Sequence, residues 1–482
     1  MTLHRIRRQR WQVAVPDATT AFAMRLLLRR TQDSTLLPAL AEAFDAVDVG
    51  EREVHIPRLH VRLDFASADG LASALPDRLR VAVGQALREA LQGGAAGQGA
   101  EAPRDIAPAE RLVAYLASGR LAWFDAGREP PAARALLAEE AARWTQSPET
   151  NWPRLLAVPA AEGHGLAEVF FRFLQLLDDA QRARWMQFAR QPVAGPAASV
   201  AEALAELLGL YAGRPADHRL RLQALALLWL AVGASVVAAV AQWPGALAAV
   251  RALPAPGGEL AAAAWARIES AGRSATPRAE AAAELADFPA NATVGGKKGP
   301  NLKSDDQPAP GLPVAACGLV LLHPYLPRLF AGLGWIADDH PVGQPLPPAV
   351  LPPAAALLHW LATGRDEPYE FELPLIKILL GLAPDDPLPV AAGLLDAALC
   401  EEGEALLSAA IAHWPALGQT SIAGLRVSFL QRAGLLYPAP DGWLLRPQSE
   451  TYDLLLDRLP WGISLIRLGW MRGCLHTEWT PA

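Results

Sequence analysis

Residues 413–471 read HWPALGQTSIAGLRVSFLQRAGLLYPAPDGWLLRPQSETYDLLLDRLPWGISLIRLGWM. This segment combines many aromatic residues with the spacing of buried helices. Its first part predicts a helix and a hairpin that share a core formed by Phe429, Leu430, Leu435 and Trp443. Residues 449–461 predict a capped helix that ends before Pro460, because proline disfavours helical backbone at the residue before it. The alternation in ISLIRLGWM (463–471) predicts a strand.

The length and composition of the chain indicate a multidomain protein. Its 482 residues exceed what one small core needs, so two or three domains are expected. With 52% hydrophobic and 19% charged residues, the chain has enough apolar surface to bury, which excludes global disorder. The formal net charge of −7 argues against a general nucleic-acid-binding protein. The three cysteines are widely spaced and predict no disulfide framework, so folding in the cytosol fits best.

Two segments bear on targeting and on membranes. The N-terminal sequence MTLHRIRRQRW (1–11) is basic, but no apolar stretch follows it, so we expect no signal peptide. The run from Leu222 to Val250 has no charged residue and is long enough to span a bilayer. Its beginning is rich in alanine, which contributes little to membrane insertion. A buried or self-associating helix is therefore the favoured interpretation, and membrane contact is the weaker alternative.

Residues 1–92 predict an N-terminal β-α-α-β-α module. Its expected elements are a strand at 10–15, helices at 19–30 and 38–47, a strand at 55–65 and a helix at 71–91. Residues 93–129 then predict a linker followed by a helix, which ends near Gly119 and precedes the aromatic residues Trp123 and Phe124.

Residues 130–288 consist of alanine- and leucine-rich segments separated by prolines, which predicts stacked helix pairs, a bundle or a solenoid-like rod. One of these segments, 170–189, predicts an amphipathic helix. Residues 289–313 are polar and rich in glycine and proline, and predict a flexible linker. Residues 314–482 predict a C-terminal helical domain with a short hairpin or strand. The expected fold class is mainly α, with small α/β pieces.

No pattern for catalysis or for cofactor binding stands out. The sequence GGKKGPN (295–301) lacks the GxxxxGK[ST] spacing of a phosphate-binding loop. A hydrolase triad could be drawn from His413, Ser421 and Asp453, but Ser421 lacks the GxSxG elbow and suits a helix N-cap better. The candidate metal ligands have spacings that fit no known metal-binding pattern; they are Glu401, Glu402, Glu404, Cys474 and His476. The sequence therefore predicts no enzyme, no cofactor and no metal site.

Two further blocks read GLVLLHPYLPRLFAGLGW (318–335) and LLHWLATGRDEPYEFELPLIKILLGL (357–382). Together with residues 413–471, they resemble the tape measure proteins of contractile injection systems, the phage-tail-like particles that bacteria assemble to puncture other cells. The N-terminal module and ERLVAYLASGRLAWF (110–124) are similar to the same family. Two positions depart from the family's pattern, since Ala122 and Gly469 stand where proline is expected.

The resemblance identifies candidate partner-contact or motif residues within these blocks. They are His323, Pro324, Phe330, Gly364, Lys377, His413, Trp414, Arg426, Phe429, Trp443, Asp453, Pro460, Trp461, Trp470 and Met471. Glu370 also matches the pattern of the second block. For any single tryptophan among the fifteen in the chain, a core position is favoured over a role as an interface anchor.

The resemblance implies a structural and assembly protein that acts as a tape measure and sets the length of the tube and sheath. It implies partners among the inner tube, hub, spike or baseplate proteins, with self-association left open. It also implies a location in the cytoplasm during assembly and then inside the particle. The 42 prolines exclude one continuous helical rod, since an interior proline costs about 3 kcal/mol or more. We therefore expect the terminal domains to hold the two ends and residues 130–313 to form an adjustable span.

Two alternatives to the ruler role remain at this point. The chain could be a folded baseplate or tube assembly factor that measures nothing. It could also be a membrane-active component that is ejected and that uses residues 222–250.

Overall fold

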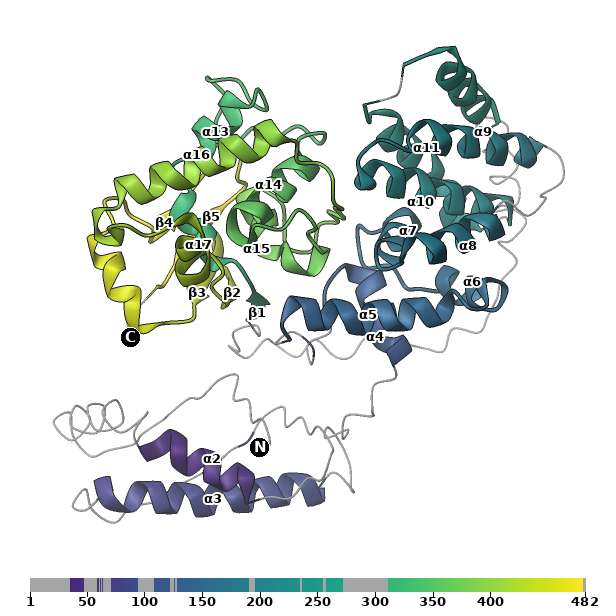
Figure 1. Ribbon diagram of the computed structural model, residues 1–482. Coiled ribbons are helices and arrows are strands. Elements are labelled where there is room, and N and C mark those ends of the chain that lie inside the picture. Colours follow the sequence, from purple (N-terminus) through teal and green to yellow (C-terminus); the bar gives the residue numbers. More distant parts are fainter. Residues whose placement is uncertain are drawn as a thin grey trace. The chain divides into compact units, whose positions relative to one another are not determined.

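The computed structural model describes residues 35–46, 59, 61, 63, 71–93, 108–121, 125, 128–189, 196–234, 236–254, 257–271 and 311–479. This part of the chain is mainly helical, with a five-stranded sheet near the C-terminus, which confirms the predicted fold class (Figure 1). The chain divides into two compact units, Met1–Ala107 and Pro108–Ala482. The domain limits expected from the sequence stay a prediction.

The first unit contains helices α2 (Leu37–Asp45) and α3 (Leu71–Gly93), where the sequence predicts helices. On α3 a leucine or valine every fourth residue faces α2, and these side chains form a core with α2: Leu75, Leu79, Val83 and Leu87. Half-buried Leu59, Val61 and Leu63 pack against this core. The predicted strand 10–15, the predicted helix 19–30 and the rest of the predicted strand 55–65 lie outside the described residues.

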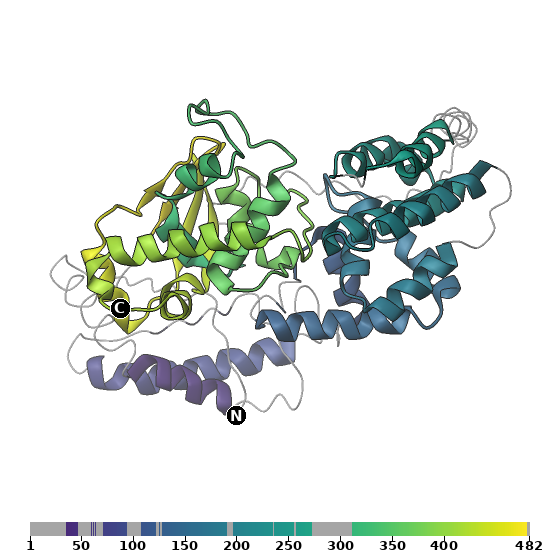
Figure 2. The ribbon, with the colours of Figure 1, turned by 45° about the horizontal axis from the view of Figure 1, so that its top comes forward.

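The second unit begins with a helical array (residues 108–271), in which short helices lie in stacked rows (Figures 1 and 2). Several of the helices start at proline, whose fixed φ suits the first helical turn. Their bounds are α4 Pro108–Ser118, α5 Pro130–Trp144, α6 Pro148–Leu156, α7 Leu166–Gln175, α8 Asp179–Ala189, α9 Pro196–Leu210, α10 Ala216–Gly233, α11 Val237–Arg251 and a helix at 259–271.

Two segments of the array differ from their predicted form. The predicted amphipathic helix 170–189 is wrong, because the chain turns after Gln175 and makes α7 and α8 instead. The uncharged run 222–250 also divides, into α10 and α11, and the rings of Trp229 and Trp243 meet 4.7 Å apart between them. Within the described residues, no helix has the length and apolar character needed to cross a bilayer.

The C-terminal subdomain (residues 311–479) is built around the sheet, whose strand order is β1-β2-β3-β5-β4. The strands are β1 Leu312–Val314, β2 Gly434–Ala439, β3 Gly442–Pro447, β4 Leu465–Ile466 and β5 Cys474–Thr477. Strands β2 and β3 form the predicted hairpin, with Leu436 opposite Leu445. Strand β5 runs parallel to β3, and the other neighbouring pairs are antiparallel.

Helices and turns complete this subdomain. Their bounds are η2 Cys317–Leu322, α13 Leu326–Gly332, α14 Leu351–Thr363, η3 Glu370–Glu372, α15 Pro374–Leu379, α16 Ala397–His413, η4 Pro415–Leu417, α17 Ile422–Leu425, η5 Arg426–Leu430 and η6 Thr451–Arg458. The helix predicted at 449–461 is the 3₁₀ helix η6, which is wound more tightly than an α-helix and ends before Pro460, as predicted. The strand predicted at 463–471 is only β4, because a turn that joins the Met471 amide to the Leu468 carbonyl ends the pairing.

Candidate functional site

Three charged side chains with no exposed surface join the helical array to the C-terminal subdomain. Arg172 comes from α7, Glu370 from η3 and Lys377 from α15. Arg172 Nε donates to Glu370 Oε2 at 2.8 Å, and Lys377 Nζ donates to Glu370 Oε1 at 2.8 Å. The Leu388 amide also donates to Oε1 at 2.8 Å, and Arg172 Nη1 donates to the Leu116 carbonyl at 2.7 Å. We call these three residues the buried triad.

The electrostatics of the buried triad keep its carboxylate ionised. Burial alone raises the pKa of Glu370, but the charges of Arg172 and Lys377 and the hydrogen bonds to the carboxylate outweigh burial and lower the pKa to about 2. Burial lowers the pKa of Lys377, and the neighbouring Glu370 carboxylate opposes that shift. Two cations share one anion, so loss of the carboxylate would leave both cations unpaired in a site without water contact.

The local sequence explains how the carboxylate reaches this place. Helix α4 ends at Ser118, and Gly119 follows with φ +68°, the left-handed conformation that glycine tolerates. A Cβ at Gly119 would lie 2.5 Å from the carboxyl carbon of Glu370. The predicted helix end at Gly119 is confirmed. The close approach of Glu370 is a second reason why glycine is required at this position, and the sequence alone does not show it.

Gly119→Ala is therefore expected to destabilise the protein more than the backbone strain alone requires. A left-handed alanine costs about 1–2 kcal/mol, and displacing the fixed carboxylate adds about 1–3 kcal/mol. Gly334→Ala is the matched control, because Gly334 has φ +69° with no atom within 4 Å of the added Cβ. Chemical denaturation of both variants measures the difference. Equal losses of stability would show that the contact with Glu370 has no energetic consequence.

Further polar contacts hold residues 366–393 of the C-terminal subdomain against the array. Asp217 of α10 accepts from the Ala391 amide at 3.0 Å and from Arg221 at 2.7 Å. Gln175 of α7 donates to the carbonyls of Pro368 and Val390, each at 2.9 Å. The half-exposed pair of Arg134 and Glu367 lies at the rim of this contact. Residues 366–393 thus bind the array through buried hydrogen bonds as well as through the buried triad.

The candidate residues from the sequence divide by burial. Those in the core are Phe330, Lys377, Trp414, Phe429, Asp453, Trp470 and Met471. Those that are half-buried are His323, Arg426, Trp443 and Trp461, and those that are exposed are Pro324, Gly364, His413 and Pro460. Lys377 is the candidate that enters the buried triad.

Several candidates from distant blocks do meet. The Tyr325 ring stacks on His413 with centroids 5.9 Å apart and meets Trp461 edge-on at 5.5 Å, which joins the block 318–335 to the block 413–471. Arg426 lies over the Trp360 ring at 4.7 Å and donates to the Leu361 carbonyl next to the end of α14. These contacts hold the motif blocks together within the C-terminal subdomain.

The hydrolase triad considered from the sequence is not assembled. Ser421 caps α17, as predicted, and accepts from the Gly424 amide at 3.0 Å. Asp453 is fully buried, where it accepts from Arg432 and from the indole of Trp479, each at 3.0 Å. His413 contacts the Tyr325 hydroxyl at 3.0 Å. Each member of the proposed triad is thus engaged with a different partner.

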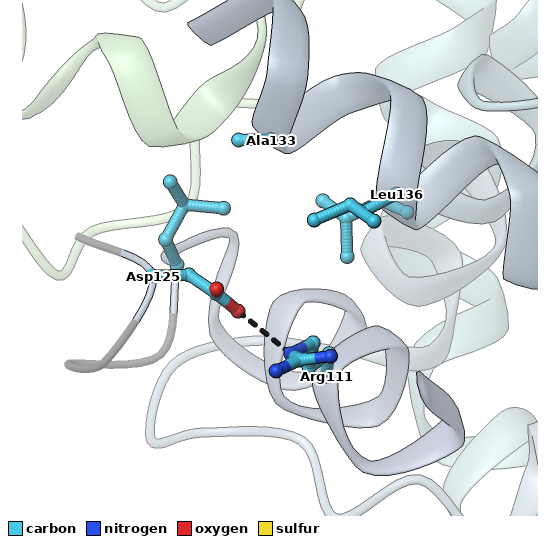
Figure 3. A pocket seen from close by; sticks show the side chains of 6 residues that line it. Arg111, Asp125, Ala133 and Leu136 are labelled. Atoms are coloured by element: carbon cyan, nitrogen blue, oxygen red, sulfur yellow. Dashed lines mark ion pairs between the residues drawn. The ribbon is translucent and has the colours of Figure 1, made fainter. Parts of the chain in front are cut away.

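A small hollow beside α4 and α5 has an ion pair on its wall (Figure 3). Arg111 and Asp125 face one another there at 3.1 Å, opposite Ala133 and Leu136. Asp125 also accepts from Arg128 at 2.5 Å. The two charged groups that line this hollow therefore pair with one another. Across the described residues, no cluster of three or more histidines, cysteines and carboxylates has the arrangement of a metal site.

The sequence reasoning missed Arg172 and His164, which both belong to the contact between the array and the C-terminal subdomain. Arg172 lies in the run FFRFLQ (170–175), where aromatic and aliphatic residues surround it on every side. Helix α7 is buried around almost its whole circumference. A lone charge in such a helix is the available signal, since a buried charge requires a partner.

Comparison with known protein families gives a match over nearly the whole chain. The family model described as contractile injection system tape measure protein matches residues 3–479. No curated protein and no solved structure matches the chain.

Proposed function

The chain belongs to the contractile injection system tape measure protein family, and on that premise we propose that it sets the length of the tube and sheath during particle assembly. The observation that carries the proposal is the extent of the match, which covers residues 3–479. The family is structural rather than enzymatic. Its members are associated with the components of the particle, and we place the inner tube, hub, spike or baseplate proteins as partners. Assembly would take place in the cytoplasm, and the protein would then lie inside the particle.

The proposed span is residues 130–313, with the terminal domains at its two ends. A helix rises 1.5 Å per residue, so the helical array (108–271) laid end to end would reach about 250 Å. Folded, a compact unit of the size of Pro108–Ala482 has a radius of gyration of only about 20 Å. A ruler of greater length therefore requires the array to separate from the C-terminal subdomain, which would open the buried triad.

A second function is favoured by the buried triad itself. Charges with no exposed surface hold the array and residues 366–393 together, as expected for a chain that works in its folded form. On this alternative the protein is a baseplate or tube assembly factor, and the particle's length is fixed elsewhere.

Deletion of residues 275–304 distinguishes the two functions, because the deletion removes no described helix or strand. If the protein is a ruler that extends along the tube, electron microscopy should show shorter tubes in the deletion variant than in the wild type. The expected shortening is about 45 Å if the segment is helical and about 100 Å if it is extended. Replacement of the same residues by an unrelated sequence of equal length is the control and should leave the tube length unchanged.

The opposite result identifies the assembly factor. Particles of unchanged length in the deletion variant, with or without a fall in their number, would contradict the ruler. A change of length in the equal-length replacement would also contradict it, since that variant keeps the number of residues.

A further inference from the structure

His164 bridges the helical array and the C-terminal subdomain beside the buried triad. The residue lies just before α7, and only 9% of its surface is exposed. Its Nε2 is 2.7 Å from the carbonyl oxygen of Asp385, which lies in the loop after α15. Its Nδ1 is 2.5 Å from Nη2 of Arg172. One imidazole ring thus contacts both parts of the unit at once.

The two partners fix the protonation state of this ring. A carbonyl oxygen can only accept a hydrogen bond, so Nε2 must carry the hydrogen. A guanidinium group can only donate, so Nδ1 must offer a lone pair. The contacts are therefore compatible with the neutral imidazole alone. A proton on Nδ1 would direct its N–H at the N–H of Arg172 and would place two cations side by side.

Both cations and carboxylates surround His164, and their net effect together with burial opposes protonation of the ring. Arg172 and Glu168 face the ring from α7, Glu370 from η3 and Lys377 from α15. Arg120, which follows α4, pairs with the carboxylate of Asp385.

Burial lowers the pKa of His164, and the Arg172 and Lys377 cations lower it further, while the Glu370 and Glu168 carboxylates raise it. The net effect is a pKa below the ordinary value of 6.5. A histidine whose folded pKa is depressed takes up its proton more readily when the contact is open. The closed contact is therefore fully stable above about pH 6.5 and loses stability as the pH falls below that value.

We propose that His164 is a proton-sensitive latch between the array and residues 382–388, closed while the imidazole is neutral and opened when Nδ1 is protonated. Opening releases the Asp385 carbonyl and separates the ring from Arg172. We expect no change in the sheet, because the hydrogen bonds of the ring go to Asp385 and Arg172, which lie outside it. The latch acts in the purified chain, so particle length does not enter its test.

Amide hydrogen exchange on the full-length protein tests the latch at pH 7.5 and pH 5.5, with rates corrected for the chemical effect of pH. In the wild type, protection in residues 382–388 is expected to fall by up to about tenfold at pH 5.5, which is the limit for one imidazole whose pKa is about 6.5 in the open contact. Protection in the hairpin β2–β3 should stay the same. Unchanged protection of 382–388 in the wild type would overturn the proposal.

His164→Gln is the decisive variant. The glutamine carbonyl can accept from Arg172 and its amide can donate to Asp385, but the side chain does not titrate. Equal protection of residues 382–388 at both pH values is expected. His323→Gln is the control, since His323 bonds to the Val320 carbonyl and also has a pKa lowered by burial, but lies outside the contact. This control should keep the pH-dependent loss, whereas a loss of the same size in His164→Gln would overturn the proposal.

If glutamine does not fit at position 164, the pH dependence of protection in the wild type still tests the proposal. If one imidazole controls the opening, protection of residues 382–388 falls by no more than tenfold per pH unit between pH 6.5 and pH 5. A steeper dependence would mean that several protons are taken up, and would assign the opening to carboxylates instead of His164.

Discussion

Glu370→Ala is expected to lower the free energy of unfolding by about 3–5 kcal/mol, because it leaves Arg172 and Lys377 buried without an anion. It also removes the acceptor for the Leu388 amide. Equilibrium unfolding in urea measures the loss. The same variant should expose the contact between the array and residues 366–393 to proteases before the sheet unfolds.

Two control variants separate the buried charge from the mere presence of an ion pair. Glu367→Ala removes the partner of Arg134, another pair that joins the array to the C-terminal subdomain but with both side chains about 40% exposed. Such a pair contributes about 0–1 kcal/mol. The combined variant Arg172→Met, Glu370→Leu and Lys377→Met leaves no unpaired buried charge, so it should cost less than Glu370→Ala. The remaining loss comes from the Leu388 amide and the Leu116 carbonyl, which lose their partners. A loss under 1 kcal/mol in Glu370→Ala would contradict the role given to the triad.

Much of the helical part of this fold could be predicted from local sequence. The helix boundaries have local causes. Prolines begin α5 and α6, and glycines end α4 and α14. Ser421 has one as well, since its hydroxyl binds an amide three residues away. The β2–β3 hairpin is equally local, with Ala439 paired to Gly442 across a short turn.

The remaining features depend on partners far away in the chain. Strand β1 pairs with β2 across more than a hundred residues, and β5 lies parallel to β3, so neither has a local signal. The partner of Arg172 is Glu370, and that of His164 is Asp385. The sequence could identify Glu370 and Lys377 as motif residues through a resemblance, but their chemistry follows only once α7 is packed against them.

Trp470→Ala is expected to cost about 3–5 kcal/mol, because this side chain holds the three motif blocks of the C-terminal subdomain together. Only 2% of Trp470 is exposed, and its ring stacks on Phe330 with centroids 5.1 Å apart. Its Nε1 donates to the Leu379 carbonyl at 2.8 Å. The backbone carbonyl oxygen of Trp470 would lie 2.5 Å from a Cβ added at Gly381, so the two segments approach closely.

Trp470→Phe separates the packing of Trp470 from its hydrogen bond. Phenylalanine can keep the stacking on Phe330 but leaves the buried Leu379 carbonyl without its donor, so a loss of about 1–3 kcal/mol is expected. Trp461→Phe is the matched comparison, since Trp461 also donates to a carbonyl, that of Leu321 at 3.0 Å, from a half-buried position that water can reach. Urea unfolding should rank the losses as Trp470→Ala, then Trp470→Phe, then Trp461→Phe. If Trp461→Phe costs as much as Trp470→Ala, the blocks 318–335 and 413–471 are held together mainly at the Tyr325–His413–Trp461 contact, which would contradict the role given to Trp470.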